Sequence, residues 1–358
     1  MLLLATPLLF ATGRQGRASL TEGSPKIAPR TTARAKERTI LGFRPTPTPS
    51  PASGTALSPA SGTGSAPARR TLLTAGGVTA AGLLTGLASG SAHATEDGVT
   101  ARLRALEERH GARLGVFAHN VRTRRSVRHR ADERFPVCSL FKVLAAAAVL
   151  RDLDRDGEVL DRRVHYTADD LVENSPVTEE HVADGMTVAE LCEAAICRSD
   201  NTAGNLLLRE LGGPRAITRF ARSIGDRVTR LDRWEPDLNS AEPWRVTDTT
   251  SPYAIGRSYA RLVLGGALEA GDRRRLTDWM LANETSVNRF RKGLPPTWTL
   301  ADKTGGGWYG ANNDAGIAWT PEGAPVVLVV QLVKPDRDAA YDHDLIVETA
   351  ALLAETLG

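Results

Sequence analysis

Segments with β-strand character lie at both ends of residues 97–358, and the long stretch between them favours helices. The predicted strands cover 114–121, about 125–130, 297–304, 316–320 and 326–333. The predicted helices cover 97–110, 139–150, 187–197, 202–211, 214–224, 252–265, 272–282 and 341–356. Strands from opposite ends of a chain can share one sheet, so the pattern predicts an α+β fold. An antiparallel sheet would be flanked by the terminal helices, with an all-helical subdomain inserted.

The predicted catalytic domain spans 95–358, with an α/β part at about 95–135 and 286–358 and a helical part at about 136–285. We expect the active site in the cleft between these two parts. One stretch, 225–251, contains two prolines and little periodicity. A loop of that length inside a compact domain is usually functional.

The first 94 residues do not have the composition of a packed fold. Residues 1–68 are expected to be a disordered Pro/Ser/Gly-rich leader, and a start codon assigned too far upstream would explain their length. Arg69-Arg70, an apolar run to about Ala88, and Ala92-His93-Ala94 are typical of a twin-arginine export signal at 69–94, cleaved after Ala94. A membrane anchor is the alternative, but the run is short and interrupted by Gly and Thr.

Charge counts exclude one class of partner for the mature protein. Ten of the 45 Lys and Arg residues and two of the 42 Asp and Glu residues lie in 1–94, so 95–358 carries a net charge of −5. The basic balance therefore belongs to the leader. No nucleic-acid partner and no stable membrane association are expected, and we predict a secreted monomer.

Three cysteines, Cys138, Cys192 and Cys197, are an odd number for an exported protein. Cys192 and Cys197 are five apart in a predicted helix, where their side chains diverge, so a local disulfide is not expected. Their spacing to histidines does not suit a metal, and no metal or cofactor is predicted. The sequence alone leaves the state of the thiols open, with small buried thiols preferred.

The tetrapeptide Ser139-Leu140-Phe141-Lys142 can supply an activated nucleophile. A serine hydroxyl needs a base within hydrogen-bond reach, and in a helix beginning at Ser139 the lysine lies one turn later on the same face. Lysine can accept that proton only when neutral. The alternative is a surface lysine after a serine N-cap, although Phe135, Val137, Leu140 and Phe141 favour burial.

Two further motifs have both a functional and a structural interpretation. Ser199 could pass a proton to a leaving nitrogen and Asn201 could hold a substrate carbonyl, but Ser199-Asp200-Asn201 taken alone favours a helix N-cap. Lys303-Thr304-Gly305 could bind a carboxylate at a strand edge, with the glycines allowing close approach of a ligand. Its alternative is a glycine-rich turn with a solvated lysine.

These motifs, with Glu235-Pro236-Asp237-Leu238-Asn239, occur in an order and spacing that resemble the class A serine β-lactamases, of an actinobacterial type. The context agrees as well: Phe135-Pro136-Val137-Cys138 precedes the serine, and Leu171-Val172-Glu173-Asn174-Ser175-Pro176 precedes the second motif. The resemblance covers about 97–358. It implies hydrolysis of the β-lactam amide through a serine acyl-enzyme, with β-lactam substrates and inhibitors as the binding partners.

The resemblance also implies a role for each matching residue. Ser139 would be acylated, with Lys142 as its general base, alone or sharing that role with Glu235 through a water, and Ser199 would protonate the β-lactam nitrogen. Glu235 and Asn239 would position the hydrolytic water. The remaining implied contacts are Asn201 with the acylamide side chain, Lys303, Thr304 and Gly305 with the substrate carboxylate, Gly306 with Ser139 as backbone oxyanion donors, and Arg233 with Asp248 as the ion pair closing the loop.

Departures from the family pattern add one residue and remove one disulfide. Asn312 stands where many members have an arginine, and Arg289 lies where others place a compensating one, so we assign Arg289 a second carboxylate contact. Gly307 stands where the family's carbapenemases have a cysteine, which leaves Cys138 without that partner.

The main alternative function is a penicillin-binding DD-peptidase, which forms the acyl-enzyme but deacylates slowly. Glu235 with Asn239 is the feature that discriminates between them. A second alternative is a non-hydrolysing β-lactam-binding receptor. The sequence does not specify the spectrum among penicillins, cephalosporins and carbapenems, inhibitor susceptibility or the translation start.

Overall fold

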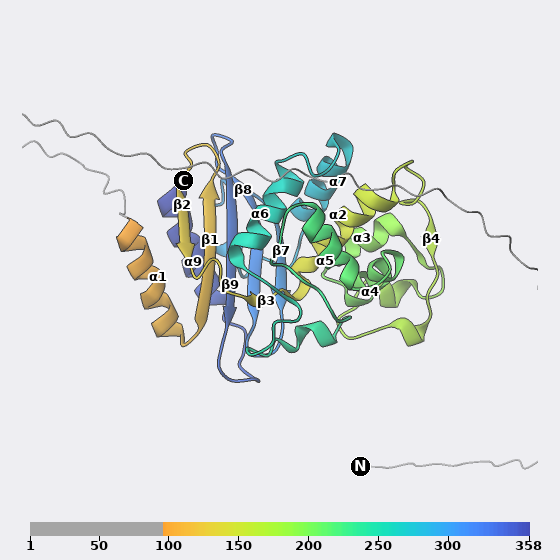
Figure 1. Ribbon diagram of the computed structural model, residues 1–358, viewed down its shortest axis with the longest axis horizontal. Coiled ribbons are helices and arrows are strands. Elements are labelled where there is room, and N and C mark those ends of the chain that lie inside the picture. Colours follow the sequence, from red (N-terminus) through yellow and green to blue (C-terminus); the bar gives the residue numbers. More distant parts are fainter. Residues whose placement is uncertain (1–95) are drawn as a thin grey trace, which may run out of the picture. The chain divides into compact units, whose positions relative to one another are not determined.

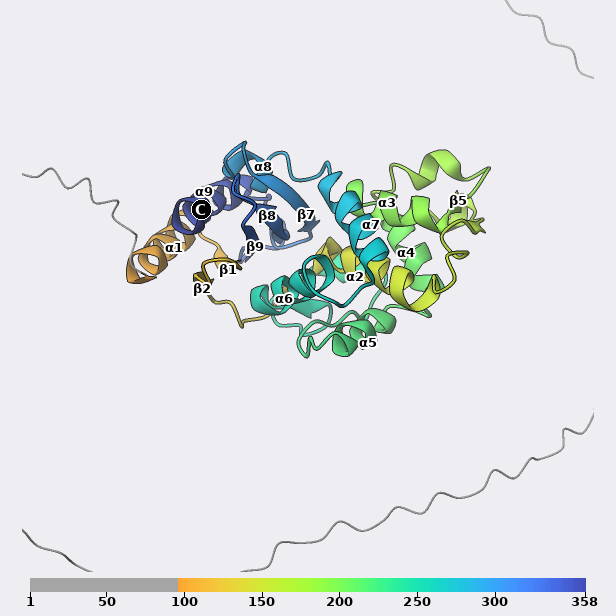
Figure 2. The ribbon, with the colours of Figure 1, turned by 90° about the horizontal axis from the view of Figure 1, so that it is seen from above.

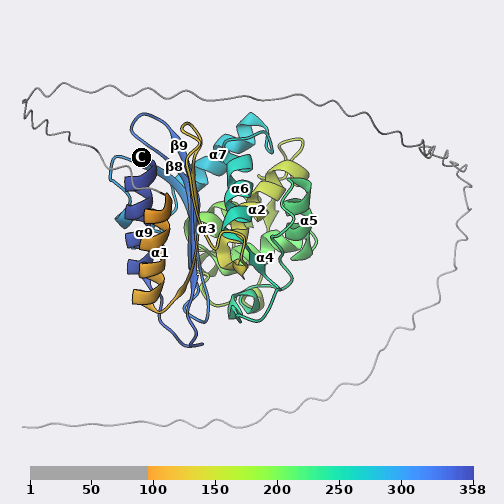
Figure 3. The same cartoon turned by 60° about the vertical axis from the view of Figure 1, so that its left-hand side comes forward.

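The computed structural model describes residues 96–358, and in this part of the chain a five-stranded antiparallel sheet lies between two groups of helices (Figures 1 and 3). Its strands are β1 (Arg113–Asn120), β2 (Ser126–His129), β7 (Thr299–Gly306), β8 (Asn312–Trp319) and β9 (Pro325–Val333), in the order β2-β1-β9-β8-β7. The predicted α+β fold is confirmed. The leader and export signal predicted for 1–94 lie outside the described residues.

Helices α1 (Glu96–His110), α8 (Phe290–Gly293) and α9 (His343–Leu357) cover one face of the sheet. The position of β9 inside the sheet, with a core on each face, explains why its sequence is almost continuously apolar. Val326, Leu328 and Val330 pack into the core shared with α1 and α9, while Val327 and Val329 pack into the core on the opposite face. Successive side chains of a strand point to opposite faces, so a central strand covered on both sides has no polar face.

The other face carries the helical part, seen from above in Figure 2. Its helices are α2 (Phe141–Ala148), α3 (Val188–Cys197), α4 (Asn201–Glu210), α5 (Arg215–Ser223), α6 (Pro252–Val263) and α7 (Ala270–Leu281). Helix α6 packs directly on β1, β8 and β9. Helix α2 is buried along its whole length and contacts α3, α4, α5 and α7. Its four alanines let these neighbours approach closely.

The structure corrects some predicted boundaries. The helix expected to begin at Ser139 begins at Phe141, after a 3₁₀ turn at Cys138–Leu140. Strand β8 starts at Asn312, four residues before the predicted start. Its first residues, Asn312, Asn313 and Asp314, are polar although they are buried, so they gave no apolar strand signal. The 225–251 stretch contains a 3₁₀ turn, Asp237–Ser240, and the two-residue strand β6 (Thr249–Thr250), which pairs with β3 (Phe135–Pro136).

A second short ladder, formed by β4 (Arg163–Val164) and β5 (Met186–Thr187), closes the far end of the helical part. Two-residue strands leave no periodic signal in a sequence, which is why neither short ladder was predicted. Among residues 96–358, no helix combines the length and the apolar character needed to cross a membrane.

The three cysteines are buried and unpaired, so the preferred interpretation as small buried thiols is confirmed. Burial raises the pKa of the Cys197 thiol to about 12, and it raises the pKa values of Cys138 and Cys192 further above the ordinary thiol range. Thiols in such surroundings are chemically inert.

Candidate active site

The turn that carries Ser139 joins strand β3 to helix α2. Cys138 has a positive φ of 43°, a left-handed conformation that turns the chain sharply before the serine. The Val137 N–H donates a hydrogen bond of 2.8 Å to the carbonyl of Asp248, which fastens the turn to the 225–251 loop. Ser139 is 6% exposed and lies at the floor of a cleft.

Lys142 lies beneath Ser139 and is completely buried. Its Nζ is 3.0 Å from Ser139 Oγ, 2.8 Å from the Ser199 carbonyl and 2.7 Å from Asn201 Oδ1, while Glu235 Oε1 lies 3.1 Å away. An ammonium group has three N–H donors, so these three hydrogen bonds use them all. Glu235 Oε1 consequently has no donor of its own. Lys142 Nζ nevertheless lies within 3.1 Å of both Ser139 Oγ and Glu235 Oε1, which is close enough to carry a proton between them.

Gly204 in α4 makes room for this lysine, and the motif-based prediction did not include it. A Cβ at this position would lie 3.0 Å from Lys142 Cε and 3.5 Å from the Phe141 ring. The sequence signal was an isolated glycine inside a helical segment, which costs helix stability and usually has a packing reason.

Both interpretations predicted for Ser199-Asp200-Asn201 fit the structure, but for different residues: one residue caps a helix and the other two face the cleft. Asp200 is the N-cap of α4 and accepts a 2.8 Å hydrogen bond from the Ala203 N–H; it also accepts one from the Thr178 hydroxyl. Ser199, with φ of 57°, and Asn201 face the cleft instead. The buried cap thus fixes two site residues that flank it.

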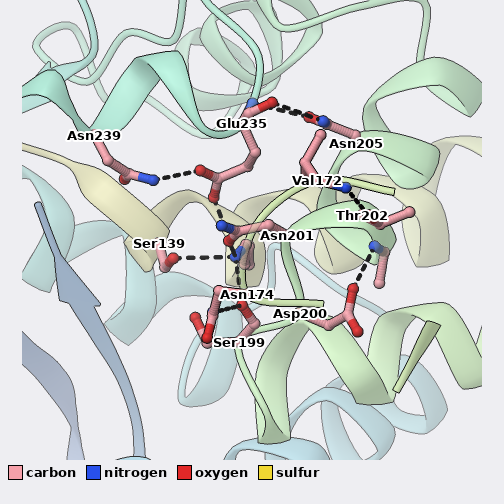
Figure 4. Close-up of polar contacts among 12 residues, drawn as sticks. Ser139, Val172, Asn174, Ser199, Asp200, Asn201, Thr202, Asn205, Glu235 and Asn239 are labelled. Atoms are coloured by element: carbon pink, nitrogen blue, oxygen red, sulfur yellow. Dashed lines mark hydrogen bonds and ion pairs between the residues drawn. The ribbon is translucent and has the colours of Figure 1, made fainter. Parts of the chain in front are cut away.

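Glu235 lies opposite Ser139 and is held at both its backbone and its side chain (Figure 4). Its N–H donates to Asn205 Oδ1 and its carbonyl accepts from Asn205 Nδ2, each at 2.9 Å. Its Oε2 accepts a 2.5 Å hydrogen bond from Asn239 Nδ2. The carboxylate is therefore aimed at the space between Ser139, Lys142 and Asn239, where a water could be activated.

The loop that carries Glu235 is closed at its base by the predicted ion pair. Arg233 Nε lies 2.6 Å from Asp248 Oδ2. Asp248 Oδ1 also accepts the backbone N–H groups of Asp232, at 2.7 Å, and Arg233, at 3.0 Å. One buried carboxylate therefore joins the two ends of the loop.

Strand β7 forms the opposite wall of the cleft and is the edge strand of the sheet, as predicted for the Lys303-Thr304-Gly305 motif. Lys303 Nζ donates to Ser199 Oγ at 3.0 Å and to the Thr304 carbonyl at 2.9 Å. Burial, and then repulsion from Lys142 and Arg289, hold the pKa of Lys303 well below its ordinary value. A Cβ at Gly305 would lie 3.1 Å from Cys138 Cβ and 3.3 Å from the Ser139 nitrogen, so a side chain here would press on the turn that carries the nucleophile.

Arg289 lies beside β7, just before α8. Its Nη1 donates to the carbonyls of Asn313, at 3.0 Å, and Gly305, at 3.3 Å, and its Nε donates to His343 Nδ1 at 3.3 Å. Burial and the Arg289 charge lower the pKa of His343 below its ordinary value. The neutral ring can therefore accept this hydrogen bond.

The cleft between β7 and the helical part is a cavity of about 410 Å³. Eight of the eleven predicted site residues line it: Ser139, Ser199, Asn201, Asn239, Arg289, Thr304, Gly305 and Gly306. Lys142, Glu235 and Lys303 lie just behind this surface. Residues that the motifs did not predict also line it, among them Glu173, Thr285, Trp308 and Tyr341; Thr285 shares a 2.5 Å hydrogen bond with the Thr304 hydroxyl. The fold and the site together define an enzyme that transfers acyl groups through a serine nucleophile.

The chain belongs to the β-lactamase enzyme family, whose model matches residues 98–357. A β-lactamase of Streptomyces fradiae is 64% identical over 296 residues, covering 81% of this chain and 96% of that protein. A β-lactamase of Streptomyces lavendulae is 60% identical over 296 residues, covering 81% and 97%.

Solved structures agree with this assignment. The β-lactamase from Streptomyces albus G superposes with a TM-score of 0.72 at 61% identity, covering 73% of this chain and 99% of that one. An ancestral class A β-lactamase superposes with a TM-score of 0.69 at 52% identity, covering 72% and 99%. The protein is a class A serine β-lactamase, a hydrolase of the amide bond of β-lactam antibiotics that confers resistance to them. The DD-peptidase alternative is not favoured.

Proposed function

We propose that Ser139 forms the acyl-enzyme and that Glu235, with Asn239, activates the water that hydrolyses it. In the first half-reaction Ser139 Oγ attacks the β-lactam carbonyl carbon and its proton passes to Lys142, which must first give a proton to Glu235. The carbonyl–nitrogen bond then breaks, and Ser199 delivers a proton to the nitrogen and regains one from Lys303 at 3.0 Å. The proton that Glu235 took up passes on through Lys142 and solvent to Lys303, so Glu235 is a carboxylate again before the second half-reaction.

In the second half-reaction, water loses a proton to Glu235 and attacks the ester carbonyl. As the carbonyl–Oγ bond breaks, Glu235 returns that proton through Lys142 to Ser139 Oγ, which restores the free enzyme. The backbone N–H groups of Ser139 and Gly306 would stabilise the oxyanion in both steps. Lys303, Thr304 and Arg289 would bind the substrate carboxylate, and Asn201 the acylamide side chain. β-Lactam inhibitors would enter through the same contacts.

The observation that carries this proposal is the position of the Glu235 carboxylate between Lys142 Nζ, at 3.1 Å, and Asn239 Nδ2, at 2.5 Å. The 225–251 loop that holds Glu235 there is closed by the Arg233–Asp248 ion pair. The test is Glu235→Ala, with Glu235→Gln as the isosteric variant that also lacks a base. Both should react with nitrocefin and retain the acyl group, seen by intact mass, and turnover should fall about 10²–10⁴-fold. Ser139→Ala is the control that should gain no mass. Rapid product release by both Glu235 variants would contradict the role of Glu235.

We also propose that the protein is exported through the twin-arginine signal, cleaved after Ala94, and acts as a secreted monomer without stable membrane association. The arginine pair, the apolar run that follows it and Ala92-His93-Ala94 support this proposal. N-terminal sequencing of the secreted protein and light scattering test it. Replacing Arg69 and Arg70 by lysines should stop export; unchanged export would contradict the proposed route.

A further inference from the structure

Strand β9 contains one polar residue, Gln331, which the mechanism above does not use. Every other residue of Pro325–Val333 is apolar, and the strand has a core on each face. Gln331 is completely buried, and so is Asn313, its neighbour across the ladder on β8. Burying an amide costs free energy unless the amide is hydrogen-bonded, so both side chains are expected to have a partner.

Both side chains donate to the same acceptor, the carbonyl of Pro136. Asn313 Nδ2 lies 3.0 Å from this oxygen and Gln331 Nε2 lies 3.2 Å from it. A carbonyl oxygen can only accept, so the nitrogen of each amide must be the atom that faces it. The amide oxygens, Asn313 Oδ1 and Gln331 Oε1, have no donor among the described residues. Both amides are therefore oriented for Pro136 alone.

The peptide unit between Pro136 and Val137 is thereby held at both of its polar atoms. Its oxygen accepts from the two amides of the sheet, and its nitrogen, the Val137 N–H, donates to the Asp248 carbonyl at 2.8 Å. Asp248 closes the loop that carries Glu235. This one peptide unit therefore connects the sheet to the 225–251 loop, and Ser139 follows it by two residues.

Asn313 also lies close to the nucleophile turn. It is opposite Gly305 in the ladder of β7 and β8. A Cβ at Gly305 would be 3.2 Å from Asn313 Nδ2 and 3.3 Å from the Ser139 nitrogen. The amide therefore reaches Pro136 at the point where β7 lies against the turn. If Pro136 moved away from the sheet, the Ser139 N–H would move away from β7, which carries Gly306.

We infer that Asn313 and Gln331 are positioning residues for Ser139. Their amides hold the Pro136 carbonyl on the sheet, and this sets the distance of the Ser139 N–H from the Gly306 N–H. The inference rests on the oxyanion role proposed above for these two N–H groups. Neither amide side chain is among those that line the cleft, so both act through the backbone that carries the nucleophile. Oxyanion donors act at short range, so a small displacement weakens both half-reactions.

Gln331→Leu tests the inference, because leucine has a similar size and suits an apolar strand but cannot donate a hydrogen bond. Acylation by nitrocefin should slow about tenfold, and deacylation by a similar factor, since an oxyanion forms in both steps. Stopped-flow kinetics measure the two rates. Val330→Ala is the matched control: this neighbour in β9 is equally buried but faces the opposite core. It should lower stability and leave both rates unchanged.

The stretching vibration of the acyl-enzyme ester carbonyl gives a readout that a loss of stability does not change. Hydrogen bonds to a carbonyl oxygen lower this frequency, so a displaced donor raises it. Glu235→Gln is expected to retain the acyl group, and its infrared difference spectrum supplies the reference band. Adding Gln331→Leu, or Asn313→Ala, should move the band to higher wavenumber, whereas adding Val330→Ala should not.

A band that stays in place in the amide variants would overturn the inference, and so would rates equal to those of Val330→Ala. If one amide variant does not fold, the other decides, because each removes one hydrogen bond to Pro136. Failure of the proposed mechanism has a different signature, since Glu235→Gln alone would then carry no acyl group in its intact mass. The nitrocefin rates of the amide variants would still decide the inference in that case.

Discussion

Asn205 holds Glu235 by its main chain, with the amide oxygen accepting from the Glu235 N–H and the amide nitrogen donating to the Glu235 carbonyl, each at 2.9 Å. This pairing fixes the backbone from which the proposed general base projects. Helix α4 and the 225–251 loop are thereby joined at the residue where an error of about an ångström would matter most.

Asn205→Ala should therefore impair deacylation more than acylation. The 225–251 loop would no longer be fixed to α4 at Glu235, so the carboxylate would be displaced. We therefore expect kcat to fall about 10²-fold and the acyl-enzyme to accumulate. Pre-steady-state nitrocefin kinetics would show a burst followed by slow turnover. Asn205→Asp keeps the acceptor but loses the donor, so its deacylation rate should lie between those of the wild type and Asn205→Ala. A variant that slows the burst itself would show that Asn205 acts on the nucleophile instead.

Gly204→Ala should separate stability from activity. Alanine is favoured over glycine in a helix by up to about 1 kcal/mol, but its Cβ would press on Lys142 Cε at 3.0 Å. We expect a thermal midpoint that is unchanged or higher, with acylation slowed about tenfold. Gly271→Ala in α7 is the matched control, since a Cβ there meets nothing within 4 Å. Equal activity of the two variants would contradict the packing role of Gly204.

Asp248 should contribute more to stability than its partner Arg233. Asp248→Ala leaves two backbone N–H groups and the arginine without their acceptor, and we expect a loss of about 2–3 kcal/mol in the free energy of unfolding. Arg233→Met removes only the ion pair, which is partly exposed on the arginine side, and should cost about 1 kcal/mol. Urea unfolding checks the order, and the reverse order would contradict this account.

Lys303 should set an alkaline limit on activity. Its pKa lies well below the ordinary lysine value because of burial and repulsion from Lys142 and Arg289. As the pH rises through this lowered pKa, the ammonium loses its proton and can no longer attract the substrate carboxylate, so kcat/KM should fall. Lys303→Arg keeps its charge and should move the limit to higher pH in a profile of kcat/KM. An unmoved limit would assign it to another group.

Sequence patterns predicted the major elements and the motif residues well, because these depend on periodicity and on residues close together in the chain. The pairing of Lys142 with Ser139 is an example: it survives although α2 starts two residues later than expected, since a 3₁₀ turn also brings residues three apart to one face.

What sequence patterns did not reveal are contacts between segments far apart in the chain. Asn205 and Thr285 contact the site residues Glu235 and Thr304, which lie 30 and 19 positions away, and no local pattern marks these contacts. Two-residue strands such as β3 and β6 leave no periodic signal in the sequence either, although they align the nucleophile turn with the 225–251 loop.

The position of β9 between β1 and β8 has a consequence for biosynthesis. The first long strand has its main partner at the far end of the chain, with Arg113 opposite Val333. During translation β1 can pair only with the short β2 until nearly the whole polypeptide has left the ribosome, so the sheet must form late. A truncated or stalled chain would lack the central strand β9, which joins β1 to β8 and so connects the N-terminal strands to the β7 wall of the cleft. Only chains whose synthesis has been completed therefore contribute to the enzyme activity measured in a cell extract.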